Sequence, residues 1–226
     1  MLVRYDSEHR RMWIDQITRV KKERPFLLRH VEACHLISAL TATAKVRGDL
    51  AEVGVAFGAS AKIISTFAPS RTLHLFDTFE GLPEPTSQDS EKYKAGQYSC
   101  SLESVQQYLA NMKIEFHKGL FPLTAEAVRD NVFSFVHLDV DLYEGTLASL
   151  QFFYPRLSRG GAHLPRLLAS KRREGGFYGV LRKQAGTRYR AHWRSVHDCE
   201  AWRRRLGRAF RFVPERIAGW TGEAFA

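Results

Sequence analysis

An apolar run that stops on two acids, FSFVHLDVDLYE at residues 133–144, constrains the fold of this 226-residue chain more than any other stretch. A short apolar run that is followed by helix-compatible residues is typical of a central parallel strand leading into a crossover helix. Ligands of parallel sheets bind outside the carboxyl ends of the strands. The stretch therefore predicts a buried strand that places Asp139 and Asp141 at the rim of a binding site.

Strand-like and helix-like segments alternate along the chain with short connections. Two amphipathic helices come first and are expected either to cap the sheet or to form a subunit contact, as in a homo-oligomer. The segments expected to be helical are 8–22, 27–46, 59–67, 102–112, 125–130 and 143–153. The segments expected to be strands are 49–55, 72–77, 114–117 and the run from Phe133, and Gly160-Gly161 is expected to turn the chain toward one more. This order predicts an α/β fold with a doubly wound, mostly parallel sheet and helices on both faces.

One long interruption lies inside this pattern. Residues 78–101 are polar and punctuated by Pro83 and Pro85, with aromatic residues at Tyr93 and Tyr98. An irregular insertion of this length inside a compact domain is usually functional, so the segment, called the lid below, is predicted to border the binding site.

The net charge of +10 lies entirely in the last part of the chain. Residues 1–160 carry 19 basic and 19 acidic side chains, whereas residues 161–226 carry 15 and 5. No apolar run approaches the roughly 20 residues of a membrane span, and the first 22 residues are too charged for a signal peptide, so a cytoplasmic protein is expected. Cys34, Cys100 and Cys199 have neither disulfide nor zinc spacing and are expected to be free thiols.

The turn after the first expected strand has the pattern ExGxxxGxS, formed by Glu52, Gly54, Gly58 and Ser60. Glycines let a backbone approach a ligand closely, and Ser60 is able to cap the next helix. The next strand ends in Asp77, at a distance from Gly54 where nucleotide-binding folds place an acid on a ribose. Together these features indicate a cofactor that contains adenosine. The spacing differs from the dinucleotide motif and no P-loop occurs, which argues against NAD and ATP, and a tight turn beside a surface acid is the structural alternative.

Four strings make the chain similar to a known family: LAEVGVAFGAS, LHLFDTFEGLPEP, FHKGLFP and FSFVHLDVDLYEGTLASLQFFYPRLSRGG. They span about residues 49–161 and resemble the macrocin O-methyltransferase family, S-adenosylmethionine-dependent sugar O-methyltransferases of natural-product pathways. The resemblance implies a Rossmann-like class I methyltransferase fold. The residues that it places around the methionine part of S-adenosylmethionine are Glu52, Gly54, Gly58 and Ser60.

The resemblance also implies roles for two acids. Asp77 would bind the cofactor ribose, and Asp139 would bind Mg²⁺, which in turn holds two vicinal hydroxyls of the acceptor. Mg²⁺ prefers oxygen ligands and lowers the pKa of a bound hydroxyl, which suits Asp139 as both metal ligand and proton acceptor. The expected function is methyl transfer to a hydroxyl of a small, sugar-bearing metabolite. A cofactor-binding remnant without catalytic activity is the alternative.

The sequence leaves two interpretations open for several side chains near the predicted site. Asp141 either supports Asp139 or stabilises the N-terminus of the next helix. His117 is predicted near the adenine, and a histidine bonded within the core is an equally good interpretation. His137 faces the same strand end as Asp139 and is more typical of a core histidine than of a base. The lid residues that either contact the acceptor or remain solvated are Tyr93, Tyr98, Glu80, Glu84 and Asp89.

The resemblance ends where the composition changes. The expected parts are a helical cap at 1–48, the cofactor-binding core at 49–161 with the lid, and an arginine-rich tail at 162–226. In the family a strand ending in one or two acids completes the metal site, but here no carboxylate follows before Glu174. Reading the codons from His163 one nucleotide later permits Asp at the Arg166 codon, which suggests a tail that is out of frame. The alternative is a genuine basic arm whose arginine and aromatic side chains bind nucleic acid, giving a third function: a nucleic-acid-binding methyltransferase.

Overall fold

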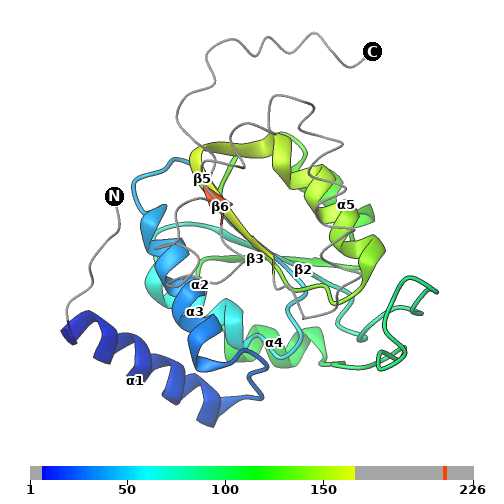
Figure 1. The fold of residues 1–226 in the computed structure, drawn as a ribbon, viewed down its shortest axis with the longest axis horizontal. Helices are drawn as coiled ribbons and strands as arrows, with labels where there is room; N and C mark the ends of the chain where they lie inside the picture. Colours follow the sequence, from blue (N-terminus) through cyan, green and yellow to red (C-terminus); the bar gives the residue numbers. More distant parts are fainter. Residues whose placement is uncertain (1–6, 166–210, 213–226) are drawn as a thin grey trace, which may run out of the picture.

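The computed structural model describes residues 7–165 and 211–212 of the chain (Figure 1). The strands are β1 Asp49–Val53, β2 Leu73–Asp77, β3 Ile114–Lys118, β4 Phe133–Leu138, β5 Leu157–Pro165 and β6 Arg211–Phe212. The helices are α1 Ser7–Glu23, α2 His30–Ala42, α3 Ala59–Phe67, α4 Leu102–Tyr108 and α5 Tyr143–Phe153, with 3-10 turns η1 Leu123–Val128 and η2 Tyr154–Arg156.

The strands form one sheet in the order β3-β2-β1-β4-β5-β6. Strands β1 to β5 pair in parallel, and β6 pairs antiparallel with β5. The prediction of a doubly wound, mostly parallel sheet is confirmed. The strand order reverses between β1 and β4, and ligands of open α/β sheets bind at the carboxyl ends of the strands beside such a reversal.

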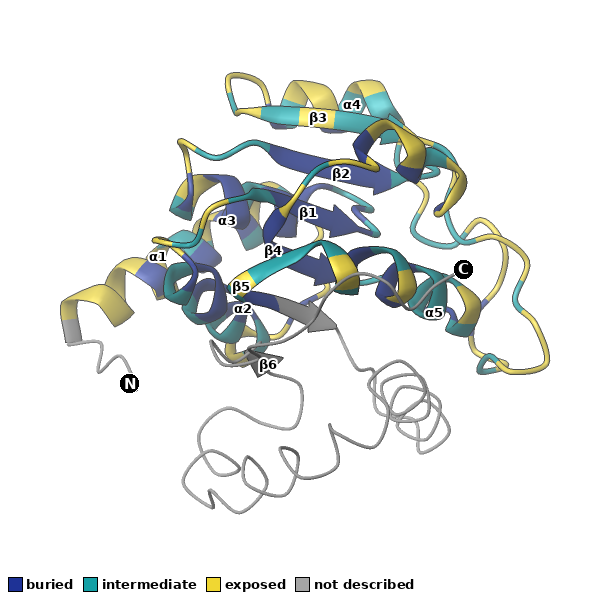
Figure 2. Cartoon of the chain, turned by 90° about the horizontal axis from the view of Figure 1, so that it is seen from above, coloured by how far each residue is buried: buried dark blue, intermediate teal, exposed yellow. Residues whose placement is uncertain are grey.

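Helices cover both faces of the sheet. Figure 1 shows α5 on the opposite side from α1, α2 and α3. The first face buries Leu36 and Ile63 in one cluster with Ile17 of α1, which packs on α2 and α3, and the second buries Phe153 against Phe133. Every residue of β4 is buried, as predicted, and Figure 2 shows the central strands as the most buried part of the sheet. Burying one such phenylalanine side chain contributes about 1.5–3 kcal/mol.

The sequence pattern misplaced some boundaries. Helix α2 begins at His30 rather than residue 27, because the Glu32 carboxylate accepts the Arg29 backbone N–H at 2.7 Å and fixes the start of the helix. Gly160-Gly161 does not precede the next strand but lies within β5. Phe133 pairs with Leu157 and Phe135 with Ala162, so β5 bulges between these pairs, where Gly160 adopts a left-handed conformation.

The lid is irregular, as its composition predicted. The lid contains neither helix nor strand. Cys34 and Cys100 are free thiols, and Cys199 lies outside the described residues. Within the described ranges, none of the helices has the length and apolar character that a membrane crossing requires.

Candidate active site

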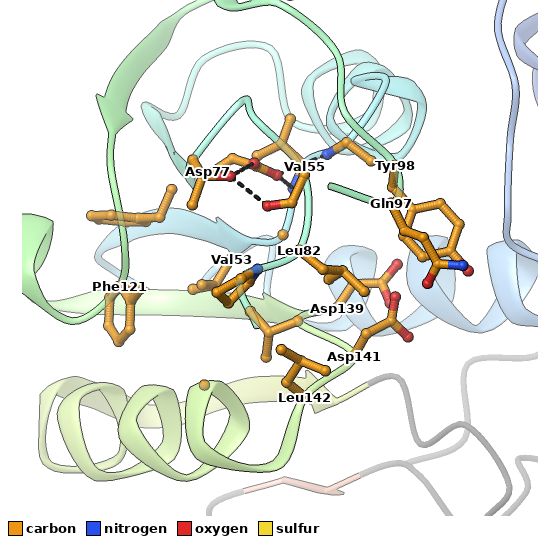
Figure 3. Close-up of a pocket in the computed structure, with 18 of the residues that line it drawn as sticks. Val53, Val55, Asp77, Leu82, Gln97, Tyr98, Phe121, Asp139, Asp141 and Leu142 are labelled. Atoms are coloured by element: carbon orange, nitrogen blue, oxygen red, sulfur yellow. Dashed lines mark hydrogen bonds between the residues drawn. The ribbon is translucent and has the colours of Figure 1, made fainter. Parts of the chain in front are cut away.

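A cavity of about 550 Å³ lies at the carboxyl ends of β1, β2 and β4 (Figure 3). Its volume is within the range of small-molecule sites, about 300–1,000 Å³. The strand ends form one wall and the lid another, and the connection between α1 and α2 adds Pro25 to Leu28. The sequence-predicted residues that line the cavity directly are Gly54, Ser60, Asp77 and Asp139.

The first turn and Asp139 are fixed against one another. The Asp139 backbone N–H donates to the Val53 carbonyl at 2.8 Å, which extends the β1–β4 pairing to the rim of the cavity. Gly54 has a φ of 86°, and a Cβ at this residue would lie 2.3 Å from the Asp139 carbonyl oxygen. Because only glycine fits both the conformation and the contact, the predicted cofactor turn and the predicted catalytic acid form one rigid unit.

Asp77 organises the turn through its carboxylate. Its Oδ2 accepts the backbone N–H groups of Val55 at 2.6 Å and Ala56 at 2.9 Å, and its Oδ1 accepts that of Phe79 at 2.8 Å. Figure 3 shows the Asp77 carboxylate directed toward Val55. The acid therefore joins the end of β2, the β1 turn and the start of the lid, on the wall where its predicted contact with a ribose would occur.

Glu52 lies beneath the turn rather than in the cavity lining. It is fully buried, and its Oε1 is 2.8 Å from Nδ1 of buried His137. Its Oε2 has no hydrogen-bond partner within the described part of the chain. His137 is thus a histidine bonded within the core through Glu52, which is one of its two interpretations.

The other two residues of the turn have separate places. Gly58 is the N-cap of α3 in a left-handed conformation, and a Cβ there would meet Val105 of α4 at 3.0 Å. Ser60 lines the cavity, but the prediction that it caps the helix is wrong, because α3 begins at Ala59 and no side chain caps it. The structure thus shows a packing role for Gly58 at the contact between α3 and α4.

His117 is not brought to the cavity. Its Nε2 lies 3.1 Å from Nδ1 of His74, and its ring stacks on Phe76 with centroids 4.4 Å apart. Burial, and next the charge of His74, lower the pKa of His117 and favour a neutral ring. The structure thus places this residue in a histidine pair on β2 and β3, outside the lining of the cavity.

Asp141 holds the lid. The Tyr93 hydroxyl donates to Asp141 Oδ1 at 2.9 Å, and both side chains are buried. Asp141 has a φ of 54°, so the turn between β4 and α5 adopts a left-handed residue at this contact. The structure therefore assigns Asp141 a partner in the lid, an interaction that neither interpretation of this acid included.

The start of α5 is capped by the lid and not by Asp141. The Tyr143 backbone N–H donates to Asp89 Oδ1 at 2.7 Å. The Asp89 Oδ2 accepts the Thr86 backbone N–H at 2.8 Å, so one carboxylate joins the lid to the helix. A carboxylate at a helix N-terminus is favoured by the free N–H groups and the helix dipole. Two contacts thus dock the lid beside Asp139.

The remaining lid residues divide between cavity and surface. Tyr98, Glu84 and Asp89 line the cavity, as one of their two interpretations required. Glu80 instead lies at the surface, 3.3 Å from the ammonium group of Lys118. Figure 3 shows the carboxylates of Asp139 and Asp141 on the side of the cavity where Gln97 and Tyr98 lie.

The cavity wall is acidic. Six carboxylates line it, and no Lys, Arg or His side chain does so among the described residues. The acids are Asp77, Glu84, Asp89, Asp139, Asp141 and Glu144. Such a surface favours a ligand that carries positive charge or a bound cation.

Sequence reasoning missed the contribution of the N-terminal segment. Pro25 to Leu28 line the cavity between α1 and α2. The signal was Pro25, which interrupts the helical pattern and forces a connection. Nothing in that pattern shows that the connection reaches the carboxyl ends of the strands.

The sheet order and the cavity at its reversal are typical of a Rossmann-like fold, and the solved methyltransferase structures described below share it. A family model described as Macrocin-O-methyltransferase (TylF) matches residues 22–164, and the chain belongs to this family of O-methyltransferases. The predicted resemblance is confirmed and extends further toward the N-terminus than the motifs indicated. The match ends two residues beyond Ala162, where the composition begins to change.

Two solved structures are similar in fold. The O-methyltransferase NovP has a TM-score of 0.57 and 21% identity over 75% of this chain and 73% of its own. CalS11, a calicheamicin methyltransferase, has a TM-score of 0.55 and 21% identity over 79% of this chain and 85% of its own. A comparison with curated proteins found no match.

Proposed function

We propose that this chain transfers the methyl group of S-adenosylmethionine to a hydroxyl of a sugar-bearing small molecule, with Asp139 beside the reacting oxygen. The observation that carries the proposal is the rigid unit of Gly54 and Asp139 inside the cavity. This unit holds the predicted cofactor turn in contact with the predicted catalytic acid. Such a contact suits methyl transfer, because the reaction requires a fixed alignment of nucleophile and methyl group. Family membership supports the same reaction.

The strand-end wall is the proposed cofactor side. Gly54 leaves room for close approach of a ligand to the backbone, and Ser60 and Asp77 line the same wall. S-adenosylmethionine carries a sulfonium and an ammonium group, so an acidic cavity favours its binding over that of an anionic nucleotide. The predicted contact of Asp77 with ribose is part of this proposal.

Asp139 is the proposed ligand for Mg²⁺. Mg²⁺ is usually held by one or two protein carboxylates, with water and substrate oxygens completing the shell, so Asp139 in a cavity lined by further carboxylates fits. When bound, the ion would lower the pKa of the acceptor hydroxyl. Asp139 then holds the proton that leaves this hydroxyl. Asp141 is engaged with Tyr93, which makes it a support for the lid in this scheme.

The lid is the proposed acceptor side. Gln97, Tyr98 and Glu84 bring amide, hydroxyl and carboxylate groups to the cavity. These groups are suited to hydrogen bonds with the hydroxyls of a sugar. We therefore assign recognition of a glycosylated acceptor to the lid.

Calorimetry with S-adenosylmethionine, with and without Mg²⁺, tests the proposal together with a radiolabel methyl-transfer assay on a panel of glycosylated acceptors. Stoichiometric cofactor binding and Mg²⁺-dependent transfer are expected. Asp139→Asn is expected to remove transfer, whereas Asp130→Asn, which alters an exposed acid beside Arg129, serves as the matched control. Cofactor binding without turnover or metal dependence would favour the non-catalytic remnant instead.

We further infer that the sequence after about Ala162 is out of frame. The supporting observations are the family match that ends at Leu164 and the tail that carries the whole net charge. The Arg166 codon, the predicted metal-site acid and the alternative nucleic-acid arm all lie outside the described residues. Resequencing the locus tests the inference, and an intact frame encoding the printed tail would contradict it. Salt-dependent nucleic-acid binding by the full chain would support the basic arm.

A further inference from the structure

Three side chains on the edge strand β3 and its neighbour β2 come together outside the cavity. His74 comes from β2, and Glu115 and His117 come from β3, where His74 pairs with Glu115 and Phe76 with His117. One potential ligand atom from each residue lies within 4.8 Å of the other two. Because residues two apart on a strand share a face, β3 presents a carboxylate and an imidazole together to the His74 ring.

The three ligand atoms lie close enough together to share one metal ion. His74 Nδ1 is 3.1 Å from His117 Nε2 and 3.5 Å from Glu115 Oε2. Ligand atoms around a tetrahedral Zn²⁺ are separated by roughly 3.3–3.6 Å when each is about 2.0–2.2 Å from the ion. We propose that His74, Glu115 and His117 bind a divalent transition metal ion, with Zn²⁺ as the reference, between β2 and β3.

The groups around the second ring nitrogen of His74 support binding of the ion through Nδ1. Its second nitrogen, Nε2, lies 3.5 Å from Asp49 Oδ2, and Asn131 Nδ2 donates to the same carboxylate oxygen at 3.1 Å. Histidines that bind metals usually donate their other ring N–H to a carboxylate or carbonyl, which fixes the tautomer. A hydrogen on Nε2 would face Asp49 and leave Nδ1 for the ion, with the Asn131 amide nitrogen also 3.5 Å from Nε2. His117 then carries its hydrogen on Nδ1 and presents Nε2.

The site is chemically distinct from the one proposed at Asp139. Imidazole and carboxylate together suit zinc and its neighbours, whereas an all-oxygen wall suits Mg²⁺. His74 is buried but the Glu115 side chain is 61% exposed, so the ion has a path from solvent and a fourth position for water. The site therefore binds its metal whether or not the chain transfers methyl groups.

The position of the site gives it a structural consequence. Strand β3 is the edge strand, and all its residues are intermediate or exposed (Figure 2). It leads into the loop where the Gly119 backbone N–H donates to the Asp77 carbonyl at 2.9 Å. A metal ion that joins β3 to β2 would stabilise the folded chain and hold this loop against the cavity, because binding to the native state alone adds to stability.

Calorimetry of the full chain with Zn²⁺ alone, after treatment with a chelator, tests the proposal, with Co²⁺ absorption reporting coordination geometry. Stoichiometric binding, a tetrahedral Co²⁺ spectrum and a higher melting temperature with Zn²⁺ are expected. Glu115→Gln should weaken Zn²⁺ binding by about 10-fold or more and His117→Asn by about 100-fold. Glu80→Gln, an exposed acid that contacts Lys118 on the same strand, is the matched control.

The variants separate this site from other metal ligands in the chain. Other potential metal ligands lie outside the described residues: His192, His197 and Cys199. The readout is therefore the difference in Zn²⁺ affinity between each variant and wild type. Asp139→Asn should retain wild-type Zn²⁺ affinity. Since Glu115 is exposed, Glu115→Gln should fold normally. Unchanged Zn²⁺ affinity and melting temperature in both Glu115→Gln and His117→Asn would overturn the proposal.

Discussion

The two walls of the cavity are held in place by different means. The strand-end wall is fixed by backbone: Asp139 continues the β1–β4 ladder, and Gly54 is in contact with its carbonyl. The lid wall has no helix or strand and is docked by side chains, Tyr93 on Asp141 and Asp89 on the start of α5. A backbone ladder tolerates almost no displacement, whereas two side-chain contacts are able to open and close without unfolding the sheet.

From this difference we assign one part of the proposed reaction to each wall. The rigid wall carries the cofactor turn and the catalytic acid, since alignment of the methyl group and the attacking oxygen tolerates little error. In the proposed reaction the lid would recognise the acceptor and would admit a bulky molecule before it docks. Variants of the first wall should therefore affect chemistry and cofactor affinity, and variants of the second should affect acceptor affinity.

The largest effect is expected for Asp139→Asn. The amide does not accept the hydroxyl proton, so kcat for methyl transfer should fall by about 100-fold or more. Affinity for S-adenosylmethionine, measured by calorimetry, should change by less than about threefold, a free-energy change below about 0.7 kcal/mol. Transfer at the wild-type rate by Asp139→Asn would remove this acid from the mechanism.

Gly54→Ala is expected to damage the cofactor side. The new Cβ would lie 2.3 Å from the Asp139 carbonyl oxygen in a left-handed conformation. Backbone strain of this kind costs about 1–3 kcal/mol before any clash is added. Cofactor affinity should fall at least about 10-fold, and urea unfolding should show the lost stability.

Gly96→Ala is the matched control for the variant at Gly54. Gly96 has a φ of 76°, yet a Cβ there would meet nothing within 4 Å. It therefore introduces the same kind of backbone strain without the contact. Equal loss of cofactor affinity in both variants would show that the close approach to Asp139 is not the reason for the glycine.

Tyr93→Phe should loosen the lid. It removes a buried hydrogen bond to a carboxylate, an interaction that contributes about 1.5–3 kcal/mol. The KM for the acceptor should rise while cofactor affinity stays unchanged. Asp141→Ala should have a similar effect, and the double variant should lose little more than either single one, because both changes remove the same contact. Additive effects would mean that Asp141 has a separate role.

The smallest effect is expected at the surface end of the lid. Glu80 and Lys118 lie 3.3 Å apart, with side chains that are 76% and 52% exposed. Exposed ion pairs contribute about 0–1 kcal/mol. Glu80→Gln should leave the KM for the acceptor, cofactor affinity and stability within error of wild type. A raised KM would show that this contact also docks the lid.

The sequence predicted what depends on local patterns. The burial of β4 followed from its apolar run. Gly54 was expected to allow a ligand close to the backbone, and its close approach to the Asp139 carbonyl was not anticipated. The alternation of strands and helices gave the sheet. These features depend on residues that are near in sequence or on general rules of parallel sheets.

The features that were missed depend on long-range pairing. Tyr93 and Asp141 meet only because an irregular lid folds back over the β4–α5 turn, and no periodicity encodes such a path. His117 was expected near the cofactor from its place late in β3. The β2–β3 register instead directs it to the face of His74 and Phe76, and that register is fixed by the packed sheet.

The most direct test of the two-wall account is the affinity for S-adenosylmethionine of four chains measured side by side: wild type, Asp139→Asn, Gly54→Ala and Tyr93→Phe. Wild type, Asp139→Asn and Tyr93→Phe should bind with affinities within about threefold of one another, and Gly54→Ala should bind at least about 10-fold more weakly. A wild-type chain that does not bind S-adenosylmethionine, or a Gly54→Ala chain that binds it as wild type does, would contradict the account.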